Sequence, residues 1–197
     1  MFYISLYDNI PQQEESAKSL VAELFPLVPP KRRKEAIRYK SAVRQFMSLK
    51  SFCMLQDLFG VKLPDWECDE RGKPYYAEGV IASEMKYFSL SHCKNAIAVV
   101  VSDEPIGVDI ESTDRQISDS LLTYTMSDDE VEYIKGSVNE KERFIALWTK
   151  KEAVLKLIGT GITGDMRGVL KESEHYSIET SFNREKNYIC SVAVYAN

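Results

Sequence analysis

Two acidic residues, Asp109 and Glu111, stand two positions apart in the run Ile106-Gly-Val-Asp-Ile-Glu111. Alternating apolar residues predict a strand over 107–111, and side chains two positions apart on a strand point to the same face. Two carboxylates on one face can hold a hard cation such as Mg²⁺, which prefers carboxylate, phosphate and water oxygens. For this pair alone, two solvated acids at the end of a strand are the simpler explanation.

A third carboxylate, Glu152, falls within a helix predicted from about residue 140 to residue 158 and ended by Gly159. At 100° per residue, Glu152 lies at the edge of the apolar face, close to Trp148 and Leu155. A carboxylate there needs a partner, because burying an uncompensated charge is costly. Two explanations stay open: a shared cation, or an ion pair with Lys156 one turn later.

Three further segments contain side chains suited to phosphate groups. Ser91 and His92 end the run Phe88-Ser-Leu-Ser-His92 and precede an apolar strand, where a lone histidine is also commonly structural. Basic residues gather at the start of a predicted helix, and such a run is either a solvated face or a local anion site. These basic residues are Lys31, Arg32, Arg33, Lys34, Arg38 and Arg44. The segment Arg71-Gly-Lys-Pro74 predicts a turn.

The surrounding pattern predicts a mixture of helices and strands that would position these residues. Helices are expected at 16–25, 31–59, about 128–134 and 140–158, and the helix at 31–59 is expected to be one long amphipathic helix. Strands are expected at 2–6, 88–90, 97–101, 107–111, 175–180 and 188–195, while 61–86 looks irregular. Aligning Gly60 with Gly159 also pairs Arg44 with Arg143. An internal duplication and chance agreement between two amphipathic helices both explain this echo.

Composition limits the function classes. The chain has 197 residues, 44% hydrophobic and 28% charged, which indicates a folded globular protein of one domain or two small halves. A net charge of −5 argues against a general nucleic-acid binder. Four separated cysteines are typical of reduced thiols in the cytoplasm, and we expect no signal peptide and no membrane span.

Taken together, four ordered motifs resemble the Sfp-type 4′-phosphopantetheinyl transferases. These are Gly72-Lys-Pro74, Phe88-Ser-Leu-Ser-His92, Gly107-Val-Asp-Ile-Glu111 and Trp148-Thr-Lys-Lys-Glu-Ala-Val-Leu-Lys156. The resemblance implies an α+β fold of two similar α+β subdomains, 1–103 and 104–197, related by a pseudo-twofold axis with the active site in the cleft between them. It implies a monomeric, cytoplasmic enzyme of the holo-[acyl-carrier-protein] synthase class.

The implied reaction moves 4′-phosphopantetheine from coenzyme A to a serine of an apo acyl or peptidyl carrier protein, releasing 3′,5′-ADP. By resemblance, the Mg²⁺ ligands are Asp109, Glu111 and Glu152, and Glu152 is the base, directly or through a water on the metal. Lys156, and with it Lys151, would neutralise pyrophosphate charge. The resemblance also implies contacts to the two ends of the coenzyme A nucleotide. The 3′-phosphate would meet Ser91, His92, Arg44 and one basic residue from Lys31 to Lys34 (Lys31 or Arg32). The adenine would meet Gly72, Lys73 and Pro74.

Two alternatives remain open at this point. A metal-dependent nuclease also uses an acidic strand motif, but Glu111 is followed by Ser112-Thr113 without the lysine expected two positions on. A degenerate relative that binds coenzyme A or a carrier protein without transfer is the second alternative, and retention of all three acids argues against it.

Overall fold

The computed structural model describes residues 1–60, 63, 66–70, 73–76, 86–161, 166–171 and 173–196. In chain order the elements are β1 (Phe2–Tyr7), α1 (Glu14–Leu24), η1 (Phe25–Leu27), α2 (Pro30–Ala36), α3 (Ala42–Phe59), β2 (Trp66–Cys68), β3 (Pro74–Tyr76), β4 (Tyr87–His92), β5 (Ile97–Ser102), β6 (Ile106–Ser112), α4 (Asp119–Thr125), α5 (Asp128–Lys135), α6 (Glu140–Ile158), η3 (Met166–Gly168), η4 (Ser173–His175), β7 (Tyr176–Asn183) and β8 (Tyr188–Tyr195). This mixture confirms the predicted α+β class.

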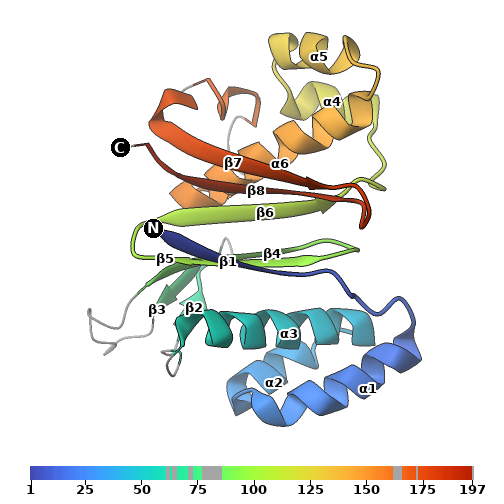
Figure 1. Ribbon diagram of the computed structural model, residues 1–197, viewed down its shortest axis with the longest axis vertical. Helices are drawn as coiled ribbons and strands as arrows, with labels where there is room; N and C mark the ends of the chain where they lie inside the picture. Colours follow the sequence, from blue (N-terminus) through green and yellow to red (C-terminus); the bar gives the residue numbers. More distant parts are fainter. Residues whose placement is uncertain are drawn as a thin grey trace.

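The elements form four layers (Figure 1). Helices α1 to α3 cover the outer face of one antiparallel sheet, ordered β1-β5-β4. Helix α6, with α4 and α5 beyond it, covers the outer face of a second antiparallel sheet, ordered β6-β8-β7. The inner faces of the two sheets pack against each other, so the molecule is an α–β–β–α stack.

Strand β5 is buried on both faces, and this explains its unbroken apolar sequence. Ile97, Val99 and Val101 point into the core beneath α3. Ala98 and Val100 point the other way and pack with residues of β6 and β8. The strand therefore contributes to two hydrophobic cores at once.

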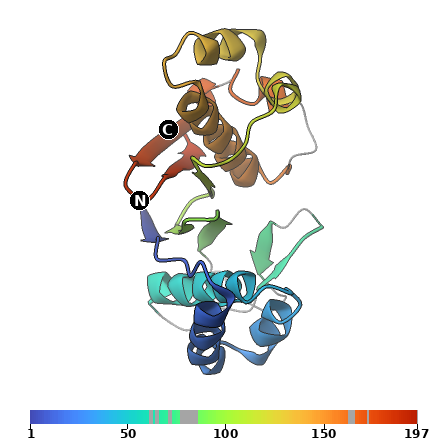
Figure 2. The ribbon, with the colours of Figure 1, turned by 90° about the vertical axis from the view of Figure 1, so that its right-hand side faces the viewer.

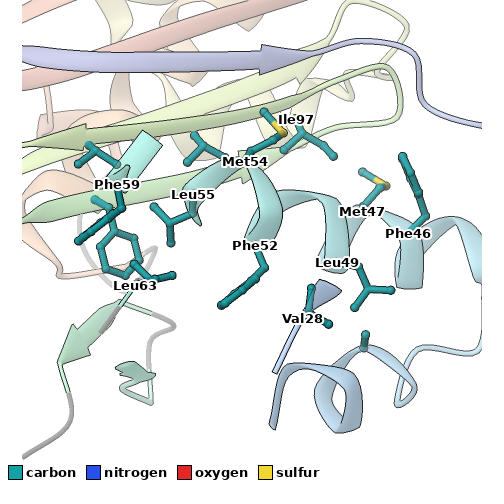
Figure 3. Packing of buried hydrophobic residues seen from close by; sticks show 14 of the residues in the cluster. Val28, Phe46, Met47, Leu49, Phe52, Met54, Leu55, Phe59, Leu63 and Ile97 are labelled. Atoms are coloured by element: carbon teal, nitrogen blue, oxygen red, sulfur yellow. The ribbon is translucent and has the colours of Figure 1, made fainter. Parts of the chain in front are cut away.

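The expected single helix over 31–59 is wrong, because the chain breaks it into α2 and α3. The carboxylate of Glu14, from α1, accepts hydrogen bonds from Ser41 Oγ at 2.6 Å and from the Ala42 amide at 2.7 Å. A tertiary contact thus caps the start of α3, where the N-cap residue Ser41 makes no side-chain cap hydrogen bond of its own. From there α3 lays Phe46, Leu49 and Leu55 into the core shown in Figure 3.

Helix α6 has the bounds that the sequence predicts. Asn139 caps its start by accepting a hydrogen bond from the Glu142 amide, and Gly159 ends it with φ of 85°, a left-handed conformation that suits glycine. Where α6 crosses β6, Gly107 meets the helix backbone: a Cβ at this position would lie 2.0 Å from the Ala153 carbonyl oxygen. Only glycine lets the helix and the strand approach this closely.

The stretch expected to be irregular, 61–86, contains a short antiparallel hairpin, β2–β3. Figure 2 shows the hairpin at one side of the molecule, between α3 and the end of α6. Lys73 joins it to the other half of the chain, donating from Nζ to the carbonyls of Leu157 at 3.3 Å and Ile158 at 3.2 Å. In the described ranges, none of the helices has the length and apolar character needed to cross a membrane.

Candidate active site

The three predicted acids come together where α6 crosses β6. Asp109 and Glu111 alternate with Val108 and Ile110, which face the other sheet, so both acids point toward α6. Asp109 is 5% exposed and Glu152 is 8% exposed. Their charges influence one another, because the Asp109 carboxylate raises the pKa of both Glu111 and Glu152. The acids form one electrostatic cluster drawn from two elements.

Asp109 is held on one of its two oxygens. Oδ1 accepts hydrogen bonds from Ser91 Oγ at 2.8 Å and from Lys156 Nζ at 2.8 Å. Oδ2 is buried and has no hydrogen-bond partner, and the same is true of Glu152 Oε1. A buried oxygen without a donor is costly unless something else coordinates it.

The ionisation of Glu152 is strongly perturbed. Burial, followed by the neighbouring charge of Asp109, raises its pKa from 4.5 to about 7, although Lys156 acts in the opposite direction. Burial likewise raises the pKa of Glu111, against the effect of the Arg115 guanidinium. A carboxyl group with a pKa near neutrality can accept and release a proton under physiological conditions.

The described residues do not contain three or more His, Cys, Asp or Glu side chains already gathered as a metal-binding cluster. Instead, Asp109 contacts Lys156, and Glu111 contacts Arg115. The two unpartnered oxygens and the all-carboxylate donor set nevertheless fit a hard divalent cation. Such an ion would require the carboxylates to turn from their basic partners toward a common point.

A cleft of about 930 Å³ runs from this cluster along α6. The hairpin β2–β3 and strand β4 form one wall, and the last turns of α6 form the other. Glu152 and Lys156 line it at the acidic end, and Lys73 and Pro74 line it on the hairpin. Gly72 lies outside the described residues.

Ser91, His92 and Arg44 gather near the acids. Ser91 contacts Asp109 directly, as described above. Loss of water around the ring, and then the positive charges of Lys156 and Arg44, lower the pKa of His92. Arg44, on the first turn of α3, is exposed and makes no hydrogen bond or ion pair within the described part of the chain. The positive charges of Arg44 and Lys156 therefore both act on the histidine, and Arg44 is the exposed one.

Three other predicted residues, Lys151, Lys31 and Arg32, make contacts away from the three acids. The Lys151 ammonium is fully buried and donates to the carbonyls of Thr125 and Met166 at 2.8 Å and to Glu130 at 2.6 Å. It therefore ties α4, α5 and η3 to α6 and does not reach the cleft, because it points away from its neighbour Glu152. Lys31 and Arg32 instead contact β2.

Two of the four basic residues on α2, Lys31 and Arg32, contact the hairpin. Lys31 pairs with Glu67 at 3.0 Å, and Arg32 donates to the Trp66 carbonyl at 3.0 Å. The Arg32 guanidinium also lies 3.5 Å from the centre of the Trp66 ring. These contacts brace the cleft wall, whereas the exposed Arg44, whose charge acts on His92, remains available for a ligand.

Arg115 was not singled out from the sequence. Its guanidinium contacts Glu111 and lies 4.3 Å from the centre of the Trp148 ring. The signal that could have found it is the four-residue spacing from Glu111 across a turn.

The part of the chain that carries the three acids is similar to known proteins. Residues 105–193, which contain all three acids, match a family model described as the 4′-phosphopantetheinyl transferase superfamily. The chain is similar to this superfamily over these residues. The matched region consists of β6, β7, β8, α6 and the segments between them, so it coincides with the half of the molecule that carries the carboxylates.

Individual relatives agree with the family match. The chain is 26% identical over 161 residues to the 4′-phosphopantetheinyl transferase psf-1 of Bacillus pumilus, covering 78% of this chain and 67% of the relative. It is 30% identical over 101 residues to the 4′-phosphopantetheinyl transferase gsp of Aneurinibacillus migulanus, covering 48% of this chain and 38% of the relative. It is 28% identical over 124 residues to a 4′-phosphopantetheinyl transferase of Bacillus subtilis, covering 61% and 54%. The alignments thus span between about two fifths and two thirds of these relatives.

Proposed function

We propose that this protein transfers 4′-phosphopantetheine from coenzyme A to a serine hydroxyl of an apo acyl or peptidyl carrier protein, releasing 3′,5′-ADP. One observation carries the proposal: a chain that matches this superfamily over residues 105–193 places three carboxylates, two with unpartnered buried oxygens, at the end of a large cleft flanked by cations. The four cysteines are unpaired, which supports a reducing cytoplasmic setting.

The metal in this proposal is Mg²⁺, held by Asp109, Glu111 and Glu152. When bound, it would supply a Lewis acid that neutralises charge on the pyrophosphate. The free Oδ2 of Asp109 and Oε1 of Glu152 support this ligand set. Lys156 lies within hydrogen-bond distance of Asp109 and also lines the cleft, so it is placed to neutralise negative charge on the departing phosphate.

Glu152 is the proposed base. The serine hydroxyl loses its proton to the Glu152 carboxylate as its oxygen forms a bond to the phosphorus next to pantetheine. The bond from that phosphorus to the bridging oxygen breaks, and 3′,5′-ADP leaves with the electron pair. The raised pKa of Glu152, about 7, supports the role because proton transfer is most effective when the base titrates near the working pH.

Coenzyme A would occupy the cleft in a fixed direction. The exposed Arg44 and the adjacent His92 and Ser91 would meet its 3′-phosphate, while Lys73 and Pro74, with Gly72, would border the adenine. The positive charges of Arg44 and Lys156 near His92 support an anion there, since both lower the histidine pKa. Lys31 and Arg32 act in this scheme by bracing the hairpin wall.

We also propose that 1–103 and 104–197 are similar halves related by a pseudo-twofold axis within a monomer. Each half has one three-stranded sheet in which the third strand lies between the first and the second. Each also has one long helix, α3 or α6, ended by a left-handed glycine. The cleft between the halves would then hold the substrate.

A transfer assay tests the proposed function. The protein is incubated with Mg²⁺, coenzyme A and each of several apo carrier proteins, and mass spectrometry follows the carriers. We expect one phosphopantetheine unit to be added to at least one carrier. A protein that binds coenzyme A but modifies none of the carriers would contradict the transferase reading and support a binding module.

Site variants sharpen the assay. Asp109→Asn and Glu152→Gln should each abolish transfer with the fold retained, and Arg44→Ala should mainly raise the KM for coenzyme A. Asp114→Asn is a matched control: this acid follows the same strand but pairs with Lys94 at 3.7 Å, away from the acidic cluster. A fully active Asp109→Asn variant would exclude the proposed metal ligand set.

A further inference from the structure

Arg115 has two contacts that the proposed reaction does not use. Its guanidinium pairs with Glu111, and its other contact is the face of Trp148, one helical turn before Glu152. The side chains of Arg115 and Glu111 are 29% and 22% exposed. An ion pair this far removed from water is stronger than a surface pair, although solvent still screens it.

A defined turn brings Arg115 back to the acids. The Arg115 amide donates to the Ser112 carbonyl at 3.1 Å, and Ser112 Oγ accepts from the Asp114 amide at 3.1 Å. Asn95, from the turn between β4 and β5, donates to the same Ser112 hydroxyl at 3.2 Å. The turn after β6 is therefore fixed by its own hydrogen bonds and by a contact across the sheets, so the guanidinium is held over the cluster.

The cluster balances three carboxylates with two basic side chains. Lys156 satisfies Asp109, Arg115 satisfies Glu111, and the charge of Arg115 also lowers the pKa of Glu152. A divalent cation and a guanidinium seek the same carboxylate oxygens, and both are positive. Each therefore disfavours the presence of the other at Glu111.

We propose that Arg115 is the internal counter-ion of Glu111, so that binding of a divalent cation exchanges the Arg115–Glu111 pair for a metal–carboxylate contact and Arg115 sets the metal affinity. The inference rests on the proposed metal site. The Trp148 face makes the exchange feasible, because an arginine that releases the carboxylate keeps a favourable contact with the ring. Arg115 is thus a positioning residue: it holds Glu111 in place and competes with the metal for the Glu111 carboxylate.

Direct metal binding gives the first test. Mn²⁺ is titrated into the protein in the absence of coenzyme A, and free Mn²⁺ is measured by electron paramagnetic resonance. Arg115→Gln should bind Mn²⁺ about fivefold more tightly than the wild type, the effect expected when a partly screened ion pair no longer competes. Equal or weaker binding by Arg115→Gln would overturn the proposal.

Arg143→Gln provides the matched control. The Arg143 guanidinium lies 4.3 Å from the centre of the Tyr133 ring, the same separation as in the Arg115–Trp148 pair, but its guanidinium donates to the Tyr133 carbonyl at 2.7 Å. Its removal should leave Mn²⁺ affinity unchanged. An equal gain in both variants would show a general effect of lost positive charge and would also overturn the proposal.

Fluorescence of Trp148 gives a test that leaves Arg115 in place. The chain has two tryptophans, so Trp148 is the sole emitter in a Trp66→Phe variant. Saturating Mg²⁺ should change its emission as the guanidinium shifts, with the concentration dependence of metal binding, and the change should vanish when Arg115→Gln is added. A silent Trp148 under Mg²⁺ saturation would contradict the exchange.

The outcomes separate the two levels of inference. Failure of wild-type protein, Arg115→Gln and Arg143→Gln alike to bind Mn²⁺ would remove the proposed metal site and, with it, the counter-ion. Normal Mn²⁺ binding combined with unchanged affinity in Arg115→Gln would remove the counter-ion alone and leave the transferase proposal standing.

Discussion

Glu152 links the chemistry of the site to the stability of the fold. Its pKa is about 7 in the folded protein, so the folded chain keeps a proton that the unfolded chain has released at intermediate pH. A raised folded pKa means that the stabilising contribution is fully present below about pH 4.5 and is lost as the pH rises through about 7. Without a divalent cation, the carboxylate form of Glu152 therefore weakens the fold.

Glu152→Gln should then stabilise the cation-free protein at pH 8. The amide cannot ionise, so the variant avoids a cost of at most roughly 3 kcal/mol at pH 8 and a much smaller cost at pH 5. Thermal unfolding in EDTA should show the variant melting several degrees above the wild type at pH 8, with most of this gap closing at pH 5. A gap that does not depend on pH would contradict the raised pKa.

At the scale of single residues, strand and helix periodicity predicts the face on which each side chain lies but not the partner that its charged end reaches. Asp109, Glu152 and Lys156 could be predicted to cluster, because strand and helix periodicity set their directions. Lys151 follows the same helix, yet its ammonium leaves the cleft for Thr125, Glu130 and Met166. Those partners come from segments whose packing the local sequence does not encode.

At the scale of elements, Gly107 controls how closely α6 approaches β6. A Cβ at this position would lie 2.0 Å from the Ala153 carbonyl oxygen and 2.5 Å from the Leu157 amide nitrogen. Because both atoms belong to the helix backbone, no rotamer change can relieve the clash. Gly107→Ala must push the helix away from the strand and so separate Glu152 from Asp109.

We therefore expect Gly107→Ala to lose at least about 1–3 kcal/mol of stability, the usual effect of overpacking, and most of its transferase activity. Urea unfolding and the carrier assay measure the two effects. Gly136→Ala is the control, because a Cβ there, at the end of α5, comes no closer than 3.3 Å to the Glu132 carbonyl oxygen and 4.0 Å to the Tyr133 carbonyl oxygen. A stable and active Gly107→Ala protein would show that the contact between helix and strand is not needed.

Lys73 acts on the other end of α6. Its ammonium contacts the carbonyls of the last helical turn, where the helix dipole is negative. Lys73→Gln should cost about 0.3–1 kcal/mol and raise the KM for coenzyme A, because the hairpin wall loses its attachment. Lys73→Arg should restore most of the loss, while Lys18→Gln, an exposed lysine on α1 paired with Glu15, should be neutral in both measurements.

Elements with a strong local signal were predicted well, and elements defined by distant partners were not. Helix α6 has a capping asparagine and a terminal glycine in sequence, and the strand at 107–111 alternates clearly. The start of α3 depends on Glu14, whose carboxylate accepts a hydrogen bond from the amide of Ala42, 28 residues later in the chain. The hairpin β2–β3 is short and depends on Lys31, Arg32 and Lys73 for its contacts, so its sequence alone looked irregular.

At the scale of the whole molecule, the two sheets share one core. Ala98 and Val100 of β5 pack with Val108, Ile110 and other residues of β6 and β8. Strand β4 adds polar links to β6, since Ser89 Oγ accepts from the Val108 amide at 3.2 Å and Ser91 contacts Asp109. Alternation in the sequence predicted these strands, but it does not specify which sheet each inner face will meet.

This shared core predicts that the molecule unfolds as one unit even though its halves have similar plans. Removing either half would expose the apolar inner face of the other, at a cost of about 25 cal/mol for each Å² of apolar surface. Trp66 reports on the half that contains α3, and Trp148 reports on the half that contains α6. Urea unfolding of Trp66→Phe and of Trp148→Phe is followed by fluorescence and by circular dichroism, which measures the loss of helix. In each variant, the fluorescence midpoint should coincide with the circular dichroism midpoint. In either variant, a fluorescence midpoint clearly separated from the circular dichroism midpoint would mean that the halves unfold independently and that the contact between the sheets contributes little.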